Sequence, residues 1–105
     1  MDFLELAADR YSVRSYSDRP IEPEKMERIL KAGQLAPTAV NFQPQKIYVL
    51  KSPEAIGKIR SLTRFAYDAP VVLLVCADKT KVWRSPSEHG YDTGEMDASI
   101  VCTHM

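Results

Sequence analysis

The stretch Val71-Val72-Leu73-Leu74-Val75-Cys76-Ala77 is a continuous apolar run in which polar and apolar residues do not alternate. A strand with one solvated face alternates, whereas a strand apolar at every position is typical of a sheet interior covered on both faces. We therefore expect a central strand here. Residues 46–50 predict a second strand, and two strands alone rarely form a stable sheet.

Helical patterns surround these strands. Residues 2–9 predict a short helix, and residues 22–35 predict a longer one that starts near a proline and ends before Pro37. Ser52-Pro53 opens a third helix, and the apolar spacing of residues 98–105 predicts a fourth that continues to the last residue. Residues 79–90 predict a polar loop or lid, in which Trp83 serves as a packing anchor or a ligand contact.

The last helical pattern carries no stop signal, and the central strand lacks enough neighbours. We therefore expect the fold to be completed outside these 105 residues. Either a C-terminal part follows this sequence, which we favour, or a second chain supplies the missing elements. The chain shows no internal repeat or linker, so residues 1–105 predict one partial domain.

Composition excludes several classes of protein. Lys plus Arg and Asp plus Glu both number 14, so no charge excess favours nucleic acid or a membrane surface. No apolar run approaches the roughly 20 residues that cross a bilayer, and the acidic N-terminus is unlike a signal peptide. We expect a cytoplasmic protein with no metal site, in which Cys76 and Cys102 are buried and unpaired.

The segment Arg10-Tyr11-Ser12-Val13-Arg14 is a candidate anion site. Guanidinium groups bind phosphate oxygens in bidentate fashion, and a serine hydroxyl adds a neutral donor. In an extended segment Arg10, Ser12 and Arg14 share one side and can reach one anion. The alternative is solvated surface charge after a helix.

The segment from Ala36 to Gln45 offers hydrogen-bonding groups in a bend. Thr38, Asn41 and Gln43 both donate and accept hydrogen bonds, which suits the pyrimidine edge of a flavin. Ala39 is small enough for a flat ring to approach the backbone. The alternative is a polar turn in which Asn41 is chosen for its turn geometry.

No side-chain constellation for bond chemistry is present: we find no nucleophile beside a base, no paired carboxylates and no glycine-rich phosphate loop. We therefore predict no catalytic side chain. If the protein is an enzyme, a bound cofactor performs the chemistry.

The chain resembles the FMN-dependent nitroreductase family. The resemblance lies in the segments at residues 10–14 and 36–44, in Asp68-Ala69-Pro70 before the apolar strand, and in Asp97-Ala98-Ser99 in the last helix. Their order and spacing cover most of the chain. Thr38 stands where the family often has serine, and Gln45 where an aromatic residue often follows.

The resemblance implies an α+β, three-layer α-β-α fold, cut off before the later strands, and a homodimer with FMN at the subunit interface. It implies that Arg10, Ser12 and Arg14 grip the flavin phosphate and ribityl chain, with main-chain contacts from Tyr11. It also implies flavin contacts, often from the partner subunit, by a second set: Pro37, Thr38, Ala39, Asn41 and Gln43.

The implied activity passes electrons from NAD(P)H through the flavin to a nitroaromatic, quinone or similar acceptor. The alternatives are a flavin- or nucleotide-binding module without catalysis and an inactive fragment.

Overall fold

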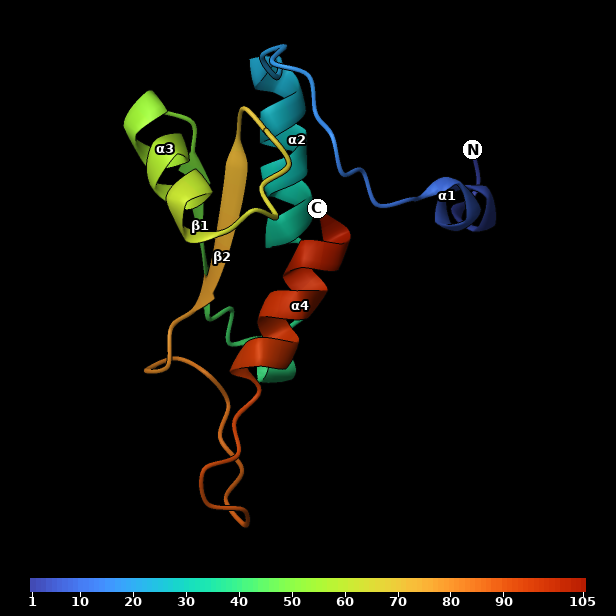
Figure 1. The fold of residues 1–105 in the computed structure, drawn as a ribbon. Helices are drawn as coiled ribbons and strands as arrows, with labels where there is room; N and C mark the ends of the chain where they lie inside the picture. Colours follow the sequence, from blue (N-terminus) through green and yellow to red (C-terminus); the bar gives the residue numbers. More distant parts are fainter.

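The computed structural model describes all residues 1–105. Four α-helices, one 3-10 helix and two strands follow one another along the chain (Figure 1). Their order is α1 (Phe3–Asp9), α2 (Pro23–Gln34), η1 (Ala39–Asn41), β1 (Gln45–Leu50), α3 (Pro53–Leu62), β2 (Val72–Ala77) and α4 (Gly94–His104). The four predicted helices and both predicted strands are confirmed to within a few residues.

Local sequence signals set the helix starts. Asp2 accepts a hydrogen bond from the amide of Glu5, and the Glu5 side chain accepts one from the amide of Asp2, which completes a capping box. Ser52 caps α3 by accepting from the amide of Ala55 at 3.1 Å. Proline occupies the first turn of α2 and of α3, where its missing N–H costs nothing.

The two strands form an antiparallel sheet that pairs Gln45 with Ala77 and Leu50 with Val72. Figure 1 shows α3 on one side of the strands and α2 and α4 on the other, which gives three layers. The free edge of β2 has no strand beside it, and Leu74 is 44% exposed. Within residues 1–105, β1 is the only neighbouring strand, so the expectation that β2 becomes a central strand through elements outside these residues stays a prediction.

Helix α4 packs against both strands and against α2. Val101 on this helix is fully buried, whereas Cys102, which we expected to be buried, is exposed. At Gly33 of α2, a Cβ atom would lie 3.0 Å from the Sδ atom of Met105 and 3.2 Å from a methyl carbon of Ile47. The missing side chain therefore allows α2 to approach the sheet and α4 closely.

The first part of the N-terminal arm, residues 1–22, extends away from the layers, whereas residues from Val13 onward border a pocket with α2 and the start of β2. Helix α1 buries none of its residues, and Phe3 is 78% exposed. Figure 1 shows α1 at the end of a long extended segment. Before Glu22, whose carbonyl accepts from the first turn of α2, one backbone hydrogen bond joins the arm to the layers, from the amide of Tyr16 to the carbonyl of Tyr67 at 3.2 Å. None of the helices has the length and hydropathy needed to span a bilayer.

Candidate functional site

The bend from Ala36 to Gln45, which we call the amide loop, has an unusual backbone. Val40, Asn41 and Gln43 all have positive φ, at 55°, 56° and 53°. Asn tolerates this region, but a β-branched residue such as Val rarely adopts it. Each such residue costs on the order of 1–3 kcal/mol and persists only where surrounding contacts hold it. Strain of this kind often accompanies a functional site.

The structure brings the polar side chains of the amide loop together, and they form hydrogen bonds with one another. The hydroxyl oxygen of Thr38 accepts from the backbone amide of Gln43 at 3.0 Å and from its Nε2 at 3.2 Å. The same Nε2 lies 2.6 Å from Oδ1 of Asn41. Asn41 is exposed. Its backbone amide donates to the carbonyl of Thr38 at 3.0 Å, whereas its side-chain nitrogen Nδ2 donates no hydrogen bond within the chain and is free to bind a ligand. Pro37 is exposed and Ala39 is half-buried.

A carboxylate from α4 fastens the amide loop from outside. Oδ1 of Asp97 accepts from the amide of Ala39 at 2.9 Å, and Oδ2 accepts from the hydroxyl of Thr93 at 2.9 Å. Asp97 is only 1% exposed. The resemblance drew attention to Asp97 as part of a motif, but no sequence pattern indicated that its partner is Ala39, 58 positions away.

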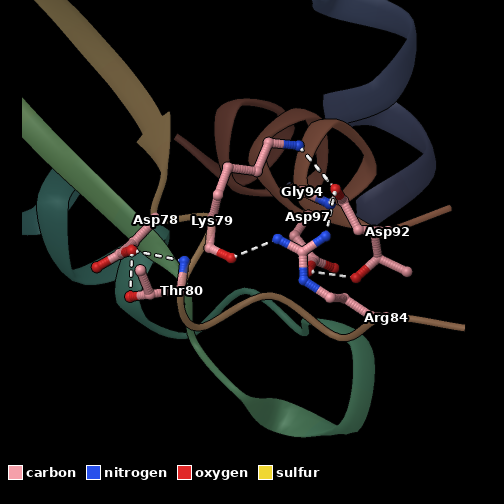
Figure 2. A network of polar contacts seen from close by, with 8 residues as sticks. Asp78, Lys79, Thr80, Arg84, Asp92, Gly94 and Asp97 are labelled. Carbon is pink, nitrogen blue, oxygen red and sulfur yellow. Dashed lines mark hydrogen bonds and ion pairs between the residues drawn. The ribbon is translucent and has the colours of Figure 1, made fainter. Parts of the chain in front are cut away.

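A second polar network closes the loop that precedes α4 (Figure 2). Asp92 binds Nζ of Lys79 at 2.9 Å and lies 3.6 Å from Nη1 of Arg84, and it accepts from the amide of Gly94 at 2.8 Å. The hydrogen bonds from Lys79 and Gly94 hold the pKa of Asp92 below its ordinary value. Asp92 thus ties residues 79–92 to the start of α4.

Trp83 lies inside this closed loop and packs edge-on against Tyr91, with ring centroids 6.4 Å apart. This geometry supports the interpretation of Trp83 as a packing anchor. At the start of the loop, hydrogen bonds from the hydroxyl and amide of Thr80 lower the pKa of Asp78.

The arginine segment lies at the other end of β2. Arg10, Tyr11, Ser12 and Arg14 are exposed on the extended arm. Arg14 lines a pocket of about 330 Å³ together with Arg60 and Arg64. Arg60 and Arg64 were not among the residues predicted from the sequence. We call these three residues the arginine cluster. A larger, mostly apolar pocket of about 570 Å³ lies beneath the arm, and it contains none of the predicted site residues.

The arginine cluster lacks acidic partners. No carboxylate oxygen lies within 4 Å of its guanidinium nitrogens, although Asp68 lines the same pocket. Arg64 stacks over the ring of Phe65 at 5.2 Å. Three cations with little charge compensation favour a multiply charged anion. The four-residue spacing of Arg60 and Arg64 was the available signal, but basic residues at a helix end are common for dipole reasons.

The two predicted segments do not meet within one chain. The arm attaches through Tyr67, before β2 begins, whereas the amide loop attaches beyond its end, where the amide of Asp78 donates to the carbonyl of Pro44 at 2.8 Å. A strand of six residues spans roughly 20 Å. One chain therefore presents the two halves of the predicted site at opposite ends of β2.

Comparison with known proteins identifies the class. The sequence profile of the Nitroreductase family matches residues 7–67, which is more than half of the chain. The chain therefore belongs to the nitroreductase family. The resemblance inferred from its motifs is confirmed, and so is the α-β-α fold.

Particular relatives agree with this assignment. An Archaeoglobus fulgidus protein whose name pairs NADH dehydrogenase with NAD(P)H nitroreductase is 36% identical over 97% of this chain. A nitroreductase family protein from Clostridium difficile 630 matches 99% of the chain, with a TM-score of 0.91 and 46% identity. The structure of an FMN-dependent nitroreductase from Clostridium difficile R20291 is also similar, with a TM-score of 0.68 and 28% identity. The match covers 91% of this chain and 53% of the chain from that organism. The chain spans 58% of the Archaeoglobus protein and 59% of the first Clostridium structure.

The Asp92 network predicts a pH-dependent stability. Folding lowers the pKa of Asp92. Its contribution to the free energy of unfolding is therefore fully present above the ordinary carboxyl pKa, and it is lost as pH falls through the pKa of the folded state. Asp92→Asn should therefore unfold at lower urea concentration than the parent at pH 7, and the gap should narrow below about pH 4. Urea titrations from pH 7 to pH 3 measure this. Glu27→Gln, at an exposed position outside any ion pair, is the control. A gap that stays constant with pH would contradict the role given to Asp92.

Proposed function

We propose that this chain is the FMN-binding part of an oxidoreductase that passes electrons from NAD(P)H through the flavin to an electron-poor acceptor such as a nitroaromatic or a quinone. The observation that carries the proposal is the arginine cluster, a phosphate-type pocket in a chain of the nitroreductase family. The FMN-dependent relative from Clostridium difficile supports the choice of flavin. Because NAD(P)H is an intracellular reductant, we place this activity in the cytoplasm.

The residues present fit a phosphorylated flavin. Arg14, Arg60 and Arg64 supply planar donors with no carboxylate in contact, which suits a phosphate dianion. Arg10 and Ser12 stand on the same extended segment as Arg14, and they would add further donors. At the amide loop, the side-chain nitrogen Nδ2 of exposed Asn41 would donate a hydrogen bond to a ring oxygen or nitrogen.

The division of labour follows from the lack of a catalytic constellation. FMN, when bound, supplies hydride acceptance and electron release. The chain's own residues bind and orient: the arginines neutralise the phosphate, and Thr38, Ala39, Asn41 and Gln43 present a shaped polar edge. A cationic setting also stabilises negative charge on a reduced ligand. Tyr11 and Pro37 would contribute contacts through the backbone and the ring.

The direct test of this function uses purified protein supplied with FMN. We expect a yellow complex that absorbs at about 450 nm, a property of the flavin itself. We also expect NADH or NADPH oxidation that depends on an added quinone or nitroaromatic. Protein that binds FMN without oxidising either nucleotide would instead indicate a binding module. Protein that stays colourless after FMN addition would count against both readings.

The arginine cluster predicts a selective loss of phosphate recognition. Arg14→Gln should weaken FMN binding about tenfold or more, since a charge-assisted hydrogen bond contributes about 1.5–3 kcal/mol. Binding of riboflavin, which lacks the phosphate, should change little. Quenching of flavin fluorescence measures both affinities. Arg28→Gln, on the exposed face of α2, is the matched control. Equal losses for FMN and riboflavin would show that Arg14 does not recognise the phosphate.

We also propose that the protein is a homodimer in which the arm of one subunit and the amide loop of its partner share a flavin. Arg14→Gln and Asn41→Ala chains should each bind FMN weakly as separate homodimers. In a mixed dimer, one of the two sites has both of its segments intact, so purified heterodimers should bind FMN tightly at about half of their sites. Random mixing gives about half heterodimers, so it should restore about a quarter of all sites. Titration of FMN into the mixture measures this. No recovery in verified heterodimers would place both segments on one subunit's site.

A further inference from the structure

Asp97 is a buried acid whose surroundings contain no cation. It is 1% exposed, and no Lys, Arg or His nitrogen lies within 4 Å of its carboxylate. Its own amide donates to the carbonyl of Thr93 at 2.8 Å, in the first turn of α4. The positive end of the helix dipole favours a carboxylate there. Neutral hydrogen-bond donors also stabilise the negative charge of the buried carboxylate.

Those donors come from two separate segments. One carboxylate oxygen accepts a hydrogen bond from the hydroxyl of Thr93, the N-cap residue of α4. The other accepts from the amide of Ala39, in the amide loop. Ala39 is the first residue of η1, so its amide has no partner within that short helix. Asp97 therefore caps η1 from another element.

The capped residue directly precedes the strained segment. Val40 and Asn41, with φ of 55° and 56°, directly follow Ala39. Thr38, which directly precedes it, accepts hydrogen bonds from the backbone amide and from Nε2 of Gln43. A shift of Ala39 would therefore disturb its neighbours Thr38 and Asn41, and Gln43 through its hydrogen bonds to Thr38.

We propose that Asp97 is a positioning residue: it clamps the amide of Ala39 and so fixes the amide loop in its flavin-binding conformation without touching the flavin. The effect on flavin binding rests on the proposed function, whereas the hydrogen bond between Asp97 and Ala39 is a property of this chain. Helix α4 thereby joins the fold's packing to the site's geometry, because the same helix buries Val101.

Three variants test the clamp. Asp97→Ala removes both acceptors and leaves the half-buried amide of Ala39 and the buried hydroxyl of Thr93 without partners. Asp97→Asn keeps one oxygen for the amide of Ala39 and can donate to the hydroxyl of Thr93. Val101→Ala, one turn further along the same helix, removes buried side-chain volume but leaves both hydrogen bonds of Asp97 in place.

The first measurement is hydrogen exchange of backbone amides without flavin. Asp97→Ala should speed exchange at Ala39 by about tenfold or more, relative to the amides of β1. Asp97→Asn should leave Ala39 protected. Val101→Ala should raise exchange in α4 and the strands without singling out Ala39.

The second measurement is FMN affinity under conditions in which all three variants are folded. Asp97→Ala should bind FMN about tenfold more weakly, and Asp97→Asn and Val101→Ala should stay within about threefold of the parent. Unchanged exchange at Ala39 in Asp97→Ala would overturn the clamp. So would an Asp97→Asn variant as impaired as Asp97→Ala, or a Val101→Ala variant with the same loss. If the parent chain binds no FMN, the proposed function fails, while the exchange data still decide whether Asp97 clamps Ala39.

Discussion

The hydrogen bond between the carboxylate of Asp97 and the amide of Ala39 joins helix α4 to the amide loop. The amide loop has three non-glycine residues at positive φ, and its internal hydrogen bonds all lie within residues 36–45. Contacts of that kind move with the loop and cannot fix it relative to the sheet. Asp97 on α4, together with the bond between Pro44 and Asp78, supplies external attachment. The loop's conformation therefore depends on where α4 is packed.

Charge in this chain is balanced overall but divided in space. The acids near the C-terminal end of β2 are satisfied: Asp92 has Lys79 and Arg84, and Asp78 has Thr80. Near the N-terminal end, the arginine cluster has no such partners. A formal net charge of zero thus conceals a local cationic pocket, which is the arrangement expected for a single phosphate group and not for a long polyanion.

Sequence patterns were sufficient for the local structure. The caps at Asp2 and Ser52, the prolines in the first turns and the apolar run of β2 each act through neighbouring residues, so they are readable from the chain. An apolar run shows what a strand requires and not what residues 1–105 provide, so a further neighbour at the free edge of β2 stays a prediction. Arg60, Arg64 and the partner of Asp97 were missed for a related reason. Their roles arise from contacts between segments far apart in sequence, and no periodicity encodes these.

The geometry of β2 constrains how the proposed site can be assembled. The arginine segment attaches before this strand and the amide loop after it, so the strand keeps them apart within one chain. The exposed arm leaves Phe3 and Leu4 without partners, which is costly for an isolated chain and is relieved if the arm packs on another subunit. In a two-fold dimer each contact occurs twice, so an arm that reaches the partner's amide loop creates two equivalent sites. The separation of the two segments is therefore what a shared flavin site requires, and the clamp at Asp97 would keep each subunit's loop ready for the arm of the other.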